Sequence, residues 1–147
     1  MEEIARQQTQ AGDRAIAARK SEWFSAMRWR RRVTAALSEA QLTFTQWLIL
    51  EATRELIAER EDAVNQNAIA ARAELDRSTV AQVMLRLQDR SLVSRDIDIT
   101  GREMRIWLTE KASLILNRHR AQLEALSASH TDKTTMAPQT RSHHRSR

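Results

Sequence analysis

Five polar side chains in residues 77–86 have the types and the spacing needed to hydrogen-bond another molecule along one face of a short helix. Apolar residues at i, i+3, i+4 and i+7 pin the opposite face to a core: Val80, Val83, Met84 and Leu87. The polar face offers guanidinium, hydroxyl and amide groups, which can bond to base edges and phosphates. The candidate DNA contacts on this face are Arg77, Ser78, Thr79, Gln82 and Arg86.

Arginines also gather on a β-hairpin predicted just downstream. Residues 92–96 and 103–108 have the composition and alternation of strands, and Gly101 lies in the link between them, where a turn needs a positive φ. The arginines are candidate contacts to a minor groove or a phosphate backbone: Arg95, Arg102 and Arg105. Asn67, in a short helix upstream, completes the set of candidate DNA contacts.

The sequence contains no recognisable catalytic constellation. It has no glycine-rich phosphate loop, no H-E-x-x-H pattern and no nucleophile elbow. The absence of cysteine excludes disulfides and thiolate metal sites. His130, His143 and His144 lie in a polar tail without the fixed spacing that structural zinc requires. We therefore expect no enzyme activity, no metal site and no cofactor.

Composition favours a small, mainly α-helical protein with an anionic partner. The chain has 147 residues, two glycines and one proline, so it is the size of one domain with few turns. The net charge of +5 favours a nucleic acid partner. Neither a membrane span nor a signal peptide is predicted, which indicates a cytoplasmic protein. Membrane-surface binding through the arginine-rich run at residues 28–32 is the less favoured alternative.

The pattern along the chain predicts five segments. Residues 1–12 are a polar, flexible lead-in, and a long helix follows over 13–41. Residues 42–109 hold the helices and hairpin described above, 110–127 a last helix, and 128–147 a disordered basic tail. Thr43 and Gln46 have the spacing of a capping box, whereas Asn65 and Asp76 are candidate N-caps of the two shorter helices. The last helix carries a near-heptad apolar stripe through His119, which needs a partner helix.

This order of elements, with the residues that mark it, resembles the MarR family of winged helix-turn-helix transcriptional regulators. LTFTQWLIL from residue 42 is similar to the L-T-x-x-Q-W-x-x-L segment of the family, and LDRSTVAQVMLRLQDRSLVSR to its recognition helix and first wing strand. GREMRIWLTEKA resembles its wing return. The resemblance covers about half of the chain. The predicted fold class is mainly α with a small β-hairpin wing, a winged helix-turn-helix with N- and C-terminal dimerisation helices.

The resemblance implies a homodimer that binds double-stranded DNA at a palindromic operator, and a repressor is the preferred interpretation. Each recognition helix would enter a major groove, with half-sites about one helical turn apart. Position by position, the polar face of residues 77–86 would meet DNA, and Arg102 matches the wing arginine of the family.

Several positions depart from the family pattern. Glycine is usual where this sequence has Glu74, Ser91 and Ala112, and Thr100 stands where an aspartate often braces the wing arginine. The wing is also about one residue shorter, and the last amphipathic helix of the family is missing. These departures leave room for an alternative from another class, a winged-helix protein-interaction module that forms heterodimers or acts as an antirepressor and has only nonspecific DNA affinity.

Aromatic and cationic side chains suggest a pocket for a small effector. The family often binds phenolic or carboxylated ligands, for which flat apolar walls and cations are suitable. The candidate lining residues are Trp23, Met27, Trp29, Arg30, Trp47 and His119. The competing interpretation is that the tryptophans and His119 belong to the core or to a dimer interface.

Overall fold

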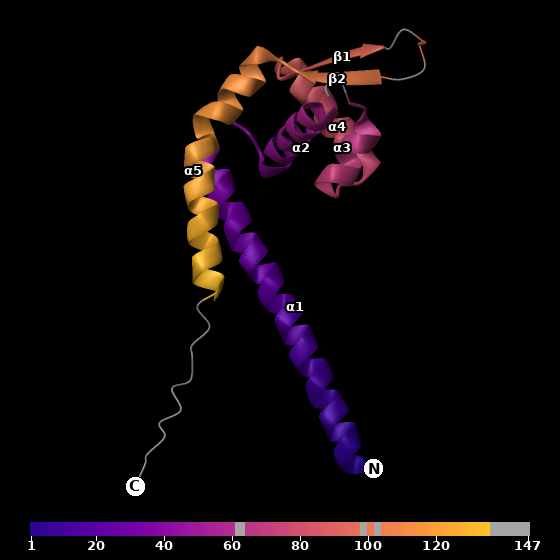
Figure 1. The fold of residues 1–147 in the computed structure, drawn as a ribbon, viewed down its shortest axis with the longest axis vertical. Coiled ribbons are helices and arrows are strands. Elements are labelled where there is room, and N and C mark those ends of the chain that lie inside the picture. Colours follow the sequence, from indigo (N-terminus) through magenta and orange to yellow (C-terminus); the bar gives the residue numbers. More distant parts are fainter. Residues whose placement is uncertain (61–63, 98–99, 102–103, 136–147) are drawn as a thin grey trace. The chain divides into compact units, whose positions relative to one another are not determined.

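The computed structural model describes residues 1–60, 64–97, 100–101 and 104–135. Five helices and a two-stranded antiparallel sheet follow one another in the order α1, α2, α3, α4, β1, β2, α5 (Figure 1). They divide into two compact units. Unit 1 contains Met1–Arg32 and Glu124–Arg147, and unit 2 contains Val33–Leu123.

Helix α1 spans Glu2–Ala36, so it begins at Glu2 and not at Asp13 as expected from the sequence. Gly12 lies inside the helix with open space around its Cα. One interior glycine costs a helix only about 1 kcal/mol, and two acidic residues in the first turn, Glu2 and Glu3, complement the helix dipole. The polar composition of residues 1–12 therefore marks an exposed helix.

Helix α5 spans Glu110–Thr135 and continues beyond residue 127, where a disordered tail was expected to begin. Two side chains, one at residue 127 and one within this extension, bond to α1 within unit 1. The Trp29 Nε1 donates to Ser127 Oγ at 3.1 Å, and Ser25 Oγ lies 2.8 Å from His130 Nε2. Small and polar residues thus extend the helix through polar contacts that an apolar pattern does not reveal. The tail beyond residue 135 lies outside the described residues.

Unit 2 is built around three helices, α2 (Phe44–Arg60), α3 (Gln66–Ala73) and α4 (Arg77–Asp89), which lie together beside the hairpin (Figure 1). The predicted capping box at the start of α2 is confirmed. The Gln46 backbone N–H donates to Thr43 Oγ1, the Thr43 N–H donates to Gln46 Oε1, and both distances are 3.1 Å. The fully buried core side chains include Ile49, Leu50, Ile69, Val80, Met84, Leu87, Leu92 and Ile106.

Strands β1 (Val93–Ile97) and β2 (Met104–Leu108) form the predicted hairpin, with Arg95 opposite Ile106. Gly101 has the expected positive φ, at 70°. Val64 adds a bridge that the sequence did not predict, because its N–H and carbonyl both pair with Ile106. The predicted fold class is confirmed: the chain is mainly α, and α3, α4 and the hairpin form a winged helix-turn-helix.

Among the described residues, no helix has the length and apolar character needed to cross a bilayer.

Candidate nucleic-acid interface

The start of α4 is set by Asp76, which occupies the predicted N-cap position with an extended backbone. Its carboxylate makes no cap bond to the backbone. Instead, Thr79 Oγ1 donates to Asp76 Oδ2 at 2.7 Å. The carboxylate still lies beside the positive end of the helix dipole, where a negative charge is favourable. The Thr79 hydroxyl, a candidate base contact, is thus already bonded within the chain.

The outer face of α4 presents most of the predicted contact residues. Val80, Met84 and Leu87 are fully buried, so the orientation of the helix is fixed by its core side. The exposed side chains from the predicted set are Arg77, Ser78, Gln82 and Arg86, with Thr79 half-buried at the margin. Hydrogen-bonding groups therefore line the side of α4 that is free of the core, as a helix entering a major groove requires.

Leu85 is a residue of this face that sequence reasoning missed. It lies three residues after Gln82 and seven after Ser78, so it continues their stripe, and it is 55% exposed. The spacing alone could have identified it. An apolar side chain in a major groove can contact the methyl group of thymine.

The turn between α3 and α4 has a left-handed backbone at Glu74, although this residue is not glycine. Glu74 ends α3 in the left-handed conformation, with φ at 54°, and Ser91 beyond α4 has φ at 58°. Both are positions where the family usually has glycine, so the left-handed conformation is adopted here without it.

The Asn65 cap at the start of α3 is confirmed, since Asn65 Oδ1 accepts from the Ala68 N–H at 2.8 Å. Asn67, in the first turn of α3, is exposed.

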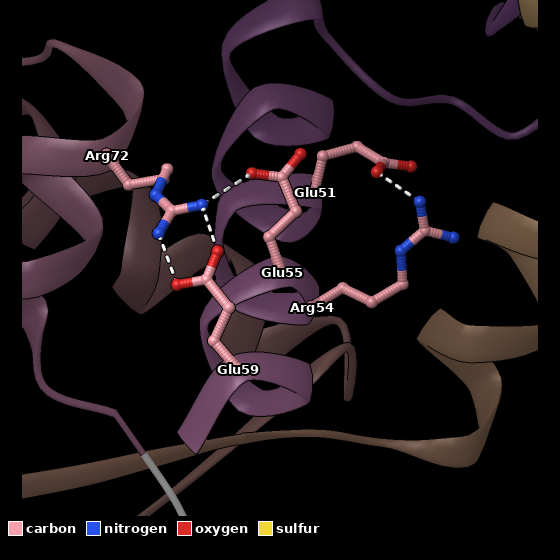
Figure 2. Close-up of polar contacts among 5 residues, drawn as sticks. All are labelled: Glu51, Arg54, Glu55, Glu59 and Arg72. Carbon is pink, nitrogen blue, oxygen red and sulfur yellow. Dashed lines mark hydrogen bonds and ion pairs between the residues drawn. The ribbon is translucent and has the colours of Figure 1, made fainter. Parts of the chain in front are cut away.

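Helix α3 is tied to α2 by an ion-pair cluster centred on Arg72 (Figure 2). The Arg72 guanidinium donates through Nη1 to Glu59 Oε1 at 2.7 Å and through Nη2 to Glu59 Oε2 at 2.5 Å. Nη1 also lies 3.3 Å from Glu55 Oε2. The hydrogen bonds with Glu59 raise the pKa of Arg72 above its ordinary value, with a smaller contribution from Glu55. This two-point geometry holds the first helix of the helix-turn-helix against α2.

The hairpin presents its arginines unequally. Arg105 is exposed opposite Asp96, on the outward face of the sheet. Arg95 shares the inward face with buried Ile106, and its Nε is buried with no hydrogen-bond partner among the described residues. Arg105 is therefore the better placed of the two for a phosphate, and Arg102 lies outside the described residues.

Burial perturbs one carboxyl group of unit 2. Desolvation raises the pKa of Glu51 on α2, opposed by the nearby charges of Arg54 and Arg120. Arg54 forms an ion pair with Glu51 along the helix (Figure 2).

The candidate effector residues belong to both units. Trp23, Met27 and Arg30 are in unit 1, where Trp23 is 61% exposed. Trp47 and His119 are in unit 2; His119 is buried, and Trp47 has its ring centroid 5.6 Å from that of Phe44. Their role as ligand contacts stays a prediction.

A cavity of about 450 Å³ lies within unit 1. The described residues that line it do not include the candidate effector residues of the preceding paragraph. It is lined by Ser21, Glu22, Ser25, Ala26, Trp29, Ser127 and His130. Trp29, expected to line an effector pocket, lines this one.

Comparison with known proteins gave matches at the level of structure. No protein-family model matches the sequence, and no curated protein matches it either. Among solved structures, CouR from Rhodococcus jostii RHA1, bound to p-coumaroyl-CoA, is 24% identical, with a TM-score of 0.63 over 73% of each chain. BpsR from Bordetella bronchiseptica, a protein whose DNA binding is regulated by 6-hydroxynicotinic acid, is 19% identical. Its TM-score is 0.69 over 83% of this chain and 88% of its own.

AbsC, a MarR family transcriptional regulator from Streptomyces coelicolor, is 18% identical, with a TM-score of 0.68 over 83% of this chain and 80% of its own. The similarity thus spans most of both chains. The chain has the winged helix-turn-helix fold of the MarR family regulators.

Proposed function

We propose that this protein is a MarR-like transcriptional regulator that binds double-stranded DNA in the cytoplasm and acts as a repressor. The observation that carries the proposal is the outer face of α4, where Arg77, Ser78, Gln82 and Arg86 are exposed on the second helix of a helix-turn-helix. The net charge of +5 adds a general attraction to phosphate. Structural similarity to regulators supports it, and no enzyme activity is proposed.

The proposed assembly is a homodimer formed through α1 and α5. Residues 2–24 of α1 are all exposed in the single chain, including the large side chains of Ile4, Ile16, Trp23 and Phe24. Most helical stability in proteins comes from packing of an apolar face, so a stretch of this length needs a partner. A second copy would supply it, and two recognition helices would then face a palindromic operator.

Wing contacts form the second part of the proposed interface. Arg105, and Arg102 by its match to the family pattern, would bind phosphate or the minor groove beside the helix. Asn67 would contribute from α3, whereas Arg95 would act less directly, because its Nε is buried.

The proposed regulation is release of DNA by a small aromatic or carboxylate ligand. CouR bound to p-coumaroyl-CoA and BpsR regulated by 6-hydroxynicotinic acid are precedents among proteins of this fold. The proposed ligand contacts are Trp23, Met27 and Arg30 in unit 1, and Trp47 and His119 in unit 2. Titration with a panel of aromatic acids tests this, since binding should change tryptophan fluorescence and lower DNA affinity together.

One observation favours the alternative, a winged-helix module that binds a protein partner. Leu85 exposes an apolar side chain in the middle of the proposed reading face. Replacing thymine by uracil in the bound site separates the two functions. If Leu85 reads DNA, removal of a thymine methyl weakens binding of the wild type and has little effect on Leu85→Ala. Equal affinity for both duplexes would favour the protein partner.

The proposed function is tested by selection of random duplexes with the purified protein at moderate salt. Enrichment of a palindrome with half-sites about ten base pairs apart supports a dimeric regulator. Retention of DNA without any motif, lost as salt rises, would show nonspecific attraction alone and would favour the interaction module.

A further inference from the structure

The residue that follows α4, Arg90, has its side chain bound to the turn between α1 and α2. Its Nη1 donates to the Gln41 carbonyl oxygen at 2.7 Å, and its Nη2 donates to the Ala40 carbonyl oxygen at 3.0 Å. Nη1 also lies 3.4 Å from Gln46 Oε1. One guanidinium therefore spans two backbone carbonyls and a side-chain amide, all in unit 2.

These carbonyls belong to the turn between α1 and α2. Helix α1 ends at Ala36, and the chain turns through residues 37–41 to Gln41, whose φ is 54°. Bonds within this turn run from the Gln41 N–H to the Ser38 carbonyl at 3.0 Å and from the Leu42 N–H to the Leu37 carbonyl at 3.4 Å. Gln46 meanwhile closes the capping box that begins α2. Arg90 thus connects the end of α4 with the turn that follows α1 and with the start of α2.

Residues at the start of α5 donate to the backbone of the segment that follows α4, residues 90–92. Lys111 Nζ donates to the Arg90 carbonyl oxygen at 3.0 Å. Thr109 Oγ1 donates to the carbonyl oxygens of Ser91 at 2.7 Å and Leu92 at 3.1 Å. Three successive carbonyls after α4 therefore receive donors from two residues. The end of α4 is fixed both to the segment that follows α1 and to the first turn of α5.

We infer that Arg90 is a positioning residue, whose side chain fixes the end of the recognition helix to the turn that follows the proposed dimerisation helix α1 and thereby determines the half-site spacing that the dimer accepts. The inference rests on the proposed function. In a symmetric dimer, the separation of the two recognition helices depends on how rigidly each is attached to the helices that form the interface. An arginine fork satisfies two carbonyls at once, whereas a lysine ammonium is a single point charge on a flexible stem.

The test uses the full-length protein as wild type, Arg90→Gln and Arg90→Lys. Ile49→Val, which shortens a buried side chain of α2, serves as the control for mild destabilisation. Each protein selects from duplexes in which two half-sites are separated by spacers of every length. We expect one spacing for the wild type and for Ile49→Val. Arg90→Gln should retain the half-site sequence but accept spacings about one base pair to either side, with Arg90→Lys in between.

Hydrogen exchange of the free proteins supplies a readout that does not depend on DNA. Amides of residues 38–46 should exchange faster in Arg90→Gln than in the wild type, with Arg90→Lys intermediate, because the turn loses its donors. Unchanged exchange would overturn the inference, since the contact would then hold nothing in place. Faster exchange with an unchanged spacing would also overturn it and leave Arg90 a structural role only.

Failure of the proposed function has a different signature. A wild-type protein that selects no spaced motif would contradict DNA reading itself and would remove the positioning role with it. A wild-type palindrome with unaltered spacing in both Arg90 variants would contradict the inference alone. If Arg90→Gln does not fold, the comparison of Arg90→Lys with wild type still tests the inference, because lysine keeps the positive charge and lacks the two-point guanidinium geometry.

Discussion

Arg72 of α3 donates to both carboxylate oxygens of Glu59 of α2, through Nη1 at 2.7 Å and through Nη2 at 2.5 Å (Figure 2). This pair joins two helices, whereas Arg19 and Glu22 form an ion pair within α1 that is largely exposed. A two-point pair between helices resists their separation, so it should contribute to the stability of unit 2.

Arg72→Ala is therefore expected to lower the midpoint of chemical denaturation, and added salt should reduce the difference from wild type because the pair is partly exposed. A double-mutant cycle with Glu59→Ala isolates the pairwise contribution. Arg19→Ala is the matched control and should leave the midpoint nearly unchanged. Additive effects of the Arg72 and Glu59 substitutions at low salt would contradict this prediction.

Two residues with left-handed backbone offer sites for stabilisation. Glu74 and Ser91 have φ of 54° and 58°, which costs an L-residue about 1–2 kcal/mol. Glycine avoids this cost, but its greater conformational freedom in the unfolded chain offsets part of the gain. Glu74→Gly and Ser91→Gly should therefore each raise the free energy of unfolding by about 0.5–1 kcal/mol. Urea denaturation measures it. Ala58→Gly, at an exposed position inside α2, should instead lose about 1 kcal/mol. A loss at Glu74 and Ser91 equal to that at Ala58 would disprove the strain.

Glu51 should make stability fall with rising pH over a limited range. Burial raises its pKa in the folded protein above 4.5, so the unfolded chain releases the proton first as pH rises. The contribution is fully present below about pH 4.5, declines until the folded carboxyl ionises, and is constant above that. The difference in free energy of unfolding between wild type and Glu51→Gln, measured by denaturation at a series of pH values, should show this decline. A rise over the same range would mean that Arg54 and Arg120 outweigh burial.

Local hydrogen-bonding signals were the part of the fold most accessible from sequence. Thr43, Gln46 and Asn65 make the predicted cap bonds because capping depends on residues only three positions apart. The outward orientation of Gln82 followed from apolar spacing on the opposite face of α4.

Features that depend on distant partners were not accessible in the same way. Val64 pairs with Ile106 through its backbone, which no side-chain pattern encodes. The Arg90 contacts join residues far apart in sequence, and burial of the Arg95 Nε depends on which face of β1 meets the core. Extension of α5 beyond residue 127 likewise accompanies contacts of Ser127 and His130 with α1.

The central claim, that the outer face of α4 reads base sequence, is tested most directly by parallel selection of random duplexes with wild type, Gln82→Ala and Arg105→Ala. The wild type should yield a palindrome. Gln82→Ala should lose preference at one symmetric pair of positions, because a bidentate contact contributes about 1–3 kcal/mol of discrimination. Arg105→Ala should keep the motif and bind all duplexes more weakly, with a smaller salt dependence. An identical motif from wild type and Gln82→Ala, or none from wild type, would contradict the claim.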